Sequence, residues 1–462
     1  MNQLKLQKKI IIPNLLLAGA LFLYVLTFYN NLSTMSVTIY FTFFINFTIV
    51  ITGILKSELA ISINKINWYF FLIFLIIIPF YQLNSGYAPR SLFLTEYEIV
   101  FTNVLIMIWC VGYYASYNLK SKRYTLKGNK SLPIPKSKGF YLTLFFSSLV
   151  SFVIAVGISG LENLFIRDAL EFSENTFGIL IFFLTRSTPA LSLAIFLWAK
   201  KKKIKVLPTY QTNLIILILL IITIILNNPI TLSRFLIGAV YLGLLISAYD
   251  MSVFKGKRFD ILLIFSIVII FPLMYAFKFY TLEQILSRSV SLEINNYNSL
   301  DFDAYQMIGR TIRYVEVVGY QYGSQLRSVL LFFMPRDIWD VKGLPSGELV
   351  ATFQNVSFTN LSSPIVAEGF IDFGIIGVLL YSLIFGKIAK FIDYRTHTCS
   401  KDSQNIYFIE IVFSFILGFF VFIYRGALQP SFLRLMGFLL FLMMLYAGTK
   451  LSESIKNNKK KR

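Results

Sequence analysis

The residues of this sequence that point most directly to chemistry are arginines inside or beside long apolar runs. Arg186 lies about ten residues into such a run, roughly 15 Å deep if the run is a helix. A charge at that depth in a membrane is costly, so it indicates a functional role or a structural ion pair. Arg234 follows one predicted turn and Arg425 begins another, where each could also reach the membrane interface. If the three converge, their forked guanidiniums suit a pyrophosphate.

A second group of candidates lies nearer the C-terminus. Glu368 and Asp372 are four residues apart at the start of an apolar run and therefore share one helix face. Glu368 is the better candidate for a general base on a substrate hydroxyl, and Asp372 is a candidate for binding substrate. The alternative is a carboxylate at the interface, paired with an arginine of the preceding loop. That loop supplies further candidates for binding an anionic substrate, namely Arg310, Arg313, Arg327 and Arg336.

Other combinations of reactive residues are weak or absent. Asp301 and Asp303 have the D-x-D spacing that binds a metal and a nucleotide diphosphate in many glycosyltransferases. Two residues often match by chance, and their loop is predicted to lie outside the cell membrane, where nucleotide sugars are absent. The single histidine, His397, falls in a predicted cytoplasmic loop. The sequence has no P-loop, no Rossmann glycine run and no Cys/His metal spacing, so we expect neither a metal nor a cofactor.

Membrane-spanning helices must position these residues. Hydrophobic residues make up 56% of the chain and charged residues 14%, against roughly a quarter charged in soluble proteins. Apolar runs of about 20 residues recur throughout, and each can cross a bilayer core as a helix. The sequence therefore predicts an all-α integral membrane protein in which residues 1–462 form one polytopic domain with about 12 transmembrane helices. The predicted spans are 10–28, 35–55, 66–83, 97–117, 140–158, 176–199, 210–226, 232–249, 260–279, 365–391, 406–424 and 430–449.

The charge pattern sets the predicted orientation. The net charge of +20 comes from short basic clusters between apolar runs, which is the positive-inside pattern and not a nucleic-acid footprint. With these spans, about 30 of the 43 Lys and Arg but only about 7 of the 23 Asp and Glu face the cytoplasm. An even number of spans places both termini there.

One predicted connection, 280–364, is far longer than the others and lies on the outer side. Long ordered loops usually carry function. Its residue spacing predicts helices at 304–319 and 324–334, each too short to span the membrane and able to lie against its surface.

Three stretches of the C-terminal half resemble Wzy-type polymerases of oligosaccharide repeat units. The first is FMPRDIW at 333–339, followed by KGLPSG at 342–347. The second is PIVAEG at 364–369, followed by DFGIIG at 372–377. The third is the Arg-Gly pair at 425–426. A large loop before the last three spans is also typical of this family.

The resemblance implies a fold, a reaction and a set of partners. The fold is related to that of the GT-C glycosyltransferases and works without a metal. In a bacterial inner membrane, a glycan on undecaprenyl pyrophosphate is moved onto a hydroxyl of the next lipid-linked unit at the outer face. Arg186, Arg234, Arg425 and Arg336 would steady the leaving pyrophosphate as its charge develops, and Glu368 would deprotonate the acceptor. A flippase and a chain-length regulator are the implied partners.

Two other classes remain as alternatives. An O-antigen ligase shares this topology and the large outer loop, but ligases are typified by a histidine in that loop, and this sequence has none there. A flippase for lipid-linked oligosaccharides has short connections throughout, which the 280–364 loop argues against.

Overall fold

The computed structural model of the chain describes residues 35–119, 132–165, 176–229, 231–249, 257–270, 297–335, 338–402 and 404–461. Within these ranges the regular structure is helical, apart from one isolated β-bridge between Pro133 and Tyr407. The α-helices are α2 (Val37–Leu55), α3 (Ile63–Leu72), α4 (Ile78–Asn84), α5 (Glu96–Asn118), α6 (Lys138–Ser159), α7 (Thr176–Lys201), α8 (Thr209–Leu226), α9 (Arg234–Ala248), α10 (Arg258–Phe265), α13 (Ala304–Val318), α14 (Ser324–Leu330), α15 (Ser346–Phe353), α16 (Ile365–Ser400), α17 (Phe408–Arg425) and α18 (Leu428–Lys461).

Nine helical segments of the described ranges are long and apolar enough to cross a membrane. They are Val37–Leu55, Ile63–Asn84, Glu96–Asn118, Lys138–Ser159, Gly178–Lys201, Thr209–Leu226, Ile365–Ser400, Phe408–Arg425 and Leu428–Ser452. They match nine predicted spans and confirm a multi-pass integral membrane protein. The span predicted at 232–249 is the shorter helix α9, of 15 residues. The span predicted at 10–28 and residues 271–279 lie outside the described residues, so the total of twelve stays a prediction.

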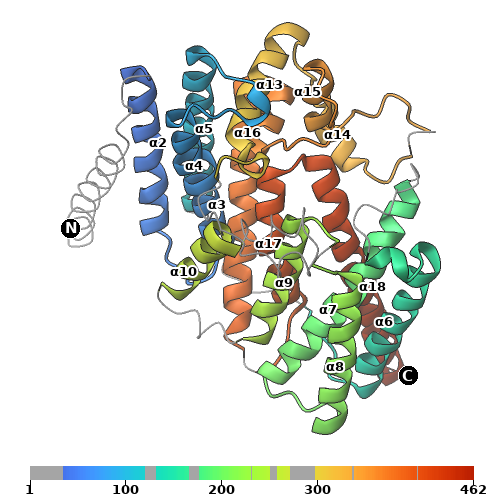
Figure 1. Cartoon of the computed structure of the whole chain (residues 1–462). Helices are drawn as coiled ribbons and strands as arrows, with labels where there is room; N and C mark the ends of the chain where they lie inside the picture. Colours follow the sequence, from blue (N-terminus) through green and yellow to red (C-terminus); the bar gives the residue numbers. More distant parts are fainter. Residues whose placement is uncertain are drawn as a thin grey trace, which may run out of the picture.

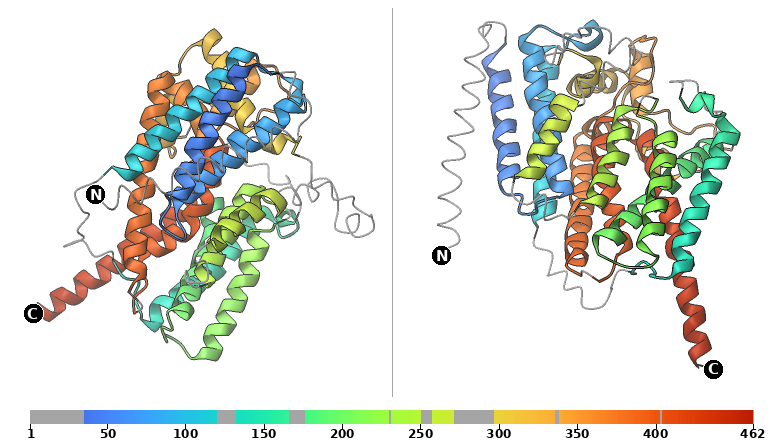
Figure 2. Two further views of the ribbon diagram at one scale, coloured as in Figure 1. Left: turned by 90° about the vertical axis from the view of Figure 1, so that its left-hand side faces the viewer. Right: turned by 60° about the horizontal axis from the view of Figure 1, so that its bottom comes forward.

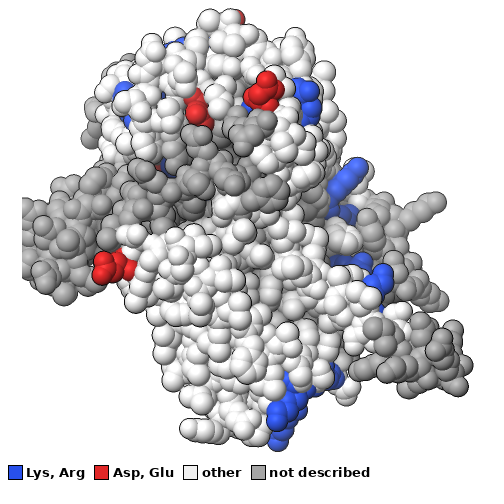
Figure 3. Space-filling view, turned by 90° about the vertical axis from the view of Figure 1, so that its right-hand side faces the viewer, with Lys and Arg blue, Asp and Glu red and all other residues white. Residues whose placement is uncertain are grey.

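The helices pack side by side in a bundle, with α5 against α16, α9 against α17, and α7 in contact with both α6 and α18 (Figure 1). Helix α18 continues past the bundle at its C-terminal end (Figure 2). The face shown in Figure 3 carries a broad uncharged surface along its middle. Large apolar side chains such as Val153 and Leu217 are more than half exposed on the outside of the bundle, which is the pattern expected for helices that face lipid.

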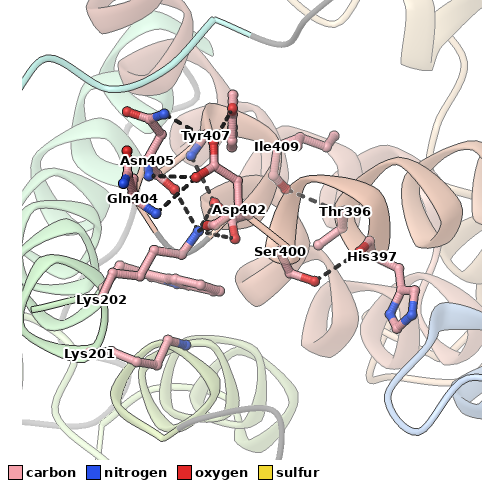
Figure 4. A network of polar contacts seen from close by, with 12 residues as sticks. Lys201, Lys202, Thr396, His397, Ser400, Asp402, Gln404, Asn405, Tyr407 and Ile409 are labelled. Carbon is pink, nitrogen blue, oxygen red and sulfur yellow. Dashed lines mark hydrogen bonds and ion pairs between the residues drawn. The ribbon is translucent and has the colours of Figure 1, made fainter. Parts of the chain in front are cut away.

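The two ends of the bundle differ in character. At one end, here called the loop end, lie α13, α14 and α15 (Figure 1). At the other, the lysine end, Lys202 reaches from the end of α7 to the connection between α16 and α17. Its Nζ donates to a carboxylate oxygen of Glu410 at 2.8 Å and to the Asp402 carbonyl at 3.0 Å (Figure 4). Hydrogen bonds from Asn405 and Tyr407 hold the pKa of the Asp402 carboxyl below its usual range.

Helix α16 is broken shortly after it begins at the loop end. Gly374 has a φ of 63° and a ψ of −146°, a conformation open almost only to glycine. Residues eight apart in a straight helix are separated by about 12 Å, yet a Cβ atom on Gly377 would overlap the carbonyl oxygen of Gly369. The chain therefore turns sharply between these two glycines. The first segment, 365–372, carries both acidic residues singled out in the sequence.

The helices predicted in the long loop are present, but their placement differs from the prediction. Helix α13 is buried along most of its length against α5, α15 and α16, and so does not lie on a membrane surface. One of its contacts with α15 is the edge-on packing of Tyr314 against Phe353, with ring centroids 5.5 Å apart. Helix α14 has only seven residues, and the sequence did not predict α15.

Candidate functional site

Arg186 lies near the middle of α7, in a polar stretch of the helix. Pro189 removes one backbone donor there, and the neighbouring serine and threonine hydroxyls donate to carbonyls of the preceding turn. The Arg186 side chain is 2% exposed, and its guanidinium lies 3.9 Å from the centre of the Phe182 ring. Its Nε and Nη1 atoms have no hydrogen-bond partner among the described residues. A buried charge left in this state is costly, which marks the position as one that can take an anion.

A second arginine, Arg434 of α18, lies at the same contact between helices. The hydroxyl of Ser187 donates to the Gly437 carbonyl at 2.8 Å, which holds α18 against α7 at this level. The Arg434 guanidinium is 5.4 Å from the Phe183 ring, next to the ring that supports Arg186. In the part of the chain that the structure describes, neither arginine forms an ion pair. Sequence reasoning missed Arg434, although a charge inside a predicted span was the available signal.

Two further arginines are bound by carboxylates of one short segment. Arg234, at the start of α9, donates from Nη2 to Asp301 Oδ1 at 2.5 Å. Arg425, at the end of α17, donates from Nη2 to Asp303 Oδ1 at 3.0 Å and from Nε to the Asp301 carbonyl at 3.0 Å. The Ser362 hydroxyl also donates to Asp303, at 2.6 Å. These two arginines are therefore compensated in charge, unlike Arg186 and Arg434.

A pair of stacked rings lies between Arg425 and Arg434. Arg425 lies 4.7 Å from the Phe235 ring, and Arg434 lies 5.3 Å from the Phe422 ring. The two rings stack at 14° with centroids 6.2 Å apart. The structure thus places Arg425 and Arg434 on either side of these rings, and Arg434 is added to the arginines that the sequence singled out.

Glu368 lies at the turn that joins Arg425 to α18. Its Oε1 accepts a hydrogen bond from the backbone N–H of Leu428 at 2.7 Å and from the Ser346 hydroxyl at 2.5 Å. Its Oε2 is buried and has no partner among the described residues. Leu428 precedes Arg434 by six residues, roughly 9 Å along a helix. One oxygen of Glu368 therefore holds the helix that carries Arg434, and the other is available to accept a proton.

Asp372 has a different role from Glu368. Its two carboxylate oxygens accept from the backbone N–H groups of Gln325 and Leu326, both at 3.0 Å, and from the Tyr381 hydroxyl at 2.8 Å. These bonds satisfy the free N–H groups at the start of α14. These hydrogen bonds tie α14 to α16. None of them involves Arg186, Arg234, Arg425 or Arg434.

Arg310 and Arg313 lie on α13 and have partners of their own. Arg313 forks onto Glu98 at the start of α5, with Nε–Oε1 and Nη2–Oε2 distances of 2.6 and 2.7 Å, and this hydrogen bonding raises the pKa of Arg313. Arg310 is buried, donates to the Pro89 carbonyl, and has its pKa lowered to about 10 by that burial. Both side chains clamp the loop to the N-terminal half of the chain. Their predicted contact with substrate stays a prediction.

The remaining sequence candidates can be placed briefly. Arg336 lies outside the described residues. No group of three metal-ligating residues occurs within the described ranges. Asp301 and Asp303 each face a guanidinium, whose positive charge opposes a metal cation at the same carboxylate. His397 lies on the last turns of α16, at the lysine end.

An apolar groove of about 290 Å³ runs along α9 from Arg234. It reaches Leu245, eleven residues further and roughly 16 Å along the helix. Its other walls come from α10, the π-helical turn Ser266–Ile270 and α17. The positive charge of Arg234 suits the anionic head group of a lipid, and the apolar lining suits its hydrocarbon chain.

Comparison with models of protein families, with curated proteins and with solved structures gave no match to this chain.

Proposed function

We propose that this protein is a glycosyltransferase that moves a glycan from a lipid pyrophosphate onto a hydroxyl of a second lipid-linked oligosaccharide, as a polymerase of the Wzy type. The observation that carries the proposal is the pair Arg186 and Arg434, two arginines at one contact between spanning helices that have no carboxylate partner among the described residues. Such a pair favours a group whose negative charge increases during the reaction, and a departing pyrophosphate is such a group.

The step needs a proton acceptor, and we assign that role to Glu368. The acceptor hydroxyl oxygen attacks the anomeric carbon of the donor glycan while the bond from that carbon to the pyrophosphate oxygen breaks. The hydroxyl proton passes to Glu368 Oε2, the carboxylate oxygen without a partner. The bonding electron pair leaves with the lipid pyrophosphate, whose new charge is stabilised by Arg186 and Arg434.

The apolar groove supports a substrate that carries a lipid. It extends from Arg234 along apolar side chains of α9, α10 and α17, a lining that suits a polyprenyl chain. The groove alone is also compatible with a flippase, which would bind the same lipid. The proposed base Glu368 and the uncompensated arginines favour group transfer, because transport alone needs no proton acceptor.

The orientation and the partners belong to the same proposal. The lysine end would face the cytoplasm of a bacterium by the positive-inside rule, which puts the loop end on the outer face of the inner membrane. Both termini would then be cytoplasmic. An upstream flippase would deliver the lipid-linked units, and a chain-length regulator would act beside the protein. The related GT-C architecture is likewise part of the proposal.

Deletion of the chain provides the test. The surface glycan of the deletion strain is separated on a gel, and its lipid-linked precursors are extracted in parallel. Loss of the long ladder, with a single repeat unit still found on its carrier at the outer face, is the expected result. A ladder that is still built on the lipid but not transferred would indicate a ligase. Absence of repeat units from the outer face would indicate a flippase.

A further inference from the structure

We propose that Arg234 and Arg425 form a second diphosphate site, and that Asp301 and Asp303 mask it as built-in anions until a lipid-linked acceptor displaces them. The inference rests on the proposed function and deepens it, because a reaction between two lipid-linked oligosaccharides needs two diphosphate sites. The first site, at Arg186 and Arg434, holds the group that gains charge. The second holds the acceptor's diphosphate, whose charge is constant during the transfer.

The segment presents two anionic groups to two arginines, as a diphosphate would. Each carboxylate meets a different arginine, Asp301 with Arg234 at 2.5 Å and Asp303 with Arg425 at 3.0 Å. The two carboxylates are two residues apart, on either side of the buried ring of Phe302. A diphosphate also presents two anionic groups, joined through one bridging oxygen. The segment and a diphosphate are therefore alternative occupants of the same two guanidiniums.

Few backbone hydrogen bonds hold the segment, although the Phe302 ring between the two aspartates is buried and packs against Phe74. The segment is a single turn of 3₁₀ helix, Leu300–Phe302, closed by one backbone hydrogen bond from Phe302 to the Ser299 carbonyl at 3.2 Å. Arg425 holds it through the carbonyls of Leu300 and Asp301, at 3.2 and 3.0 Å. A diphosphate that captures Arg425 removes these contacts together with the ion pairs. A diphosphate that binds Arg425 would therefore displace the carbonyl contacts and the carboxylates of the segment in one step.

The position of the groove indicates which diphosphate this is. The apolar groove begins at Arg234, so a chain attached to a diphosphate on this arginine would enter it directly. A free diphosphate gains nothing from that surface. The ligand of the second site is therefore a polyprenyl diphosphate.

The test uses the full-length protein in lipid nanodiscs, carrying Arg186→Met so that the first site is removed. Inorganic pyrophosphate is titrated by calorimetry into this background alone and with Asp301→Asn, Asp303→Asn or both. Asparagine keeps a hydrogen-bond acceptor for the arginine and removes the charge. We expect each change to tighten the pyrophosphate Kd about fivefold, and the factors to multiply in the double variant. Asp340→Asn, at an exposed aspartate of the same loop, should leave the Kd unchanged.

Two results of the titration would overturn the inference. An unchanged or weaker Kd in both aspartate variants would mean that these ion pairs are only structural. Tightening in one variant alone would mean that a single diphosphate does not span both arginines.

A measurement without changes to the aspartates covers the case in which these variants do not fold. Pyrophosphate should raise hydrogen exchange in the wild-type peptide that covers 299–307, because the turn is released; unchanged exchange would refute displacement. Farnesyl diphosphate should bind more tightly than inorganic pyrophosphate, and equal affinity would refute the lipid assignment. These results are separate from the proposed transfer reaction. A protein that binds in this way but forms no polymer would refute only that reaction.

Discussion

Replacing Arg186 by methionine should remove activity without weakening the fold. Methionine fills a similar apolar volume beside Phe182, and the guanidinium that it replaces forms no ion pair with a described residue. The change loses one cation–π contact, worth roughly 0.5–2 kcal/mol. It also removes a buried charge whose desolvation costs several kcal/mol. The unfolding temperature should therefore stay constant or rise.

The rate of polymer formation, in contrast to the stability, should fall strongly. Loss of one donor that stabilises developing charge typically lowers kcat by about 10²–10³-fold. The assay measures polymer formation and the unfolding temperature of the same purified Arg186→Met protein.

The matched control is Arg313→Met, which breaks a forked ion pair with Glu98. Because Arg313 is one-third exposed, the expected loss of stability is modest, roughly 1–3 kcal/mol. Its unfolding temperature should fall, which the Arg186→Met change should not cause. An Arg186→Met protein that is fully active, or that is inactive only because it unfolds, would refute the reasoning.

Three further predictions concern the base, the broken helix and metals. Glu368→Gln keeps an oxygen for both present hydrogen bonds but cannot accept a proton, so the rate should fall about 10²–10⁴-fold at unchanged stability; an unaffected rate would make Glu368 an anchor only. Gly374→Ala should lower the unfolding free energy by about 1–3 kcal/mol, because the positive φ is strained and the new Cβ would crowd Tyr320; an unchanged melting curve would contradict this. EDTA should leave polymerisation unchanged, and loss of activity that a divalent cation restores would return Asp301 and Asp303 to consideration as ligands.

Local sequence signals predicted most of the spanning helices. Hydropathy over about 20 consecutive residues is a property of the run itself, so nine spans matched with small shifts at their ends. Arg186 was found in the same way, as a charge in an apolar run. Arg434 carried the same local signal, as a charge four residues into the span predicted at 430–449, and was missed. The break in α16 was not predicted, because the span at 365–391 was read as continuous, although the glycines of DFGIIG at 372–377 lie at the break.

Contacts between distant residues could not be predicted in this way. Arg313 reads as a free cation in a loop until the fold places Glu98, 215 positions earlier, against it. Asp372 reads as a partner of Glu368 on one helix face, yet its carboxylate caps α14. The masking of Arg234 by Asp301 likewise depends on the tertiary fold. For such residues, a sequence gives the type of chemistry but not the partner.

The measurement that tests the central claim most directly is reconstitution of the purified protein in liposomes with lipid-linked repeat units extracted from the deletion strain. Without ATP or added metal, the wild-type protein should build a glycan ladder and release lipid pyrophosphate in proportion to the bonds formed, and the Arg186→Met protein should not. Movement of the lipid-linked units across the bilayer without any ladder, from a protein that is folded and binds pyrophosphate, would contradict the account.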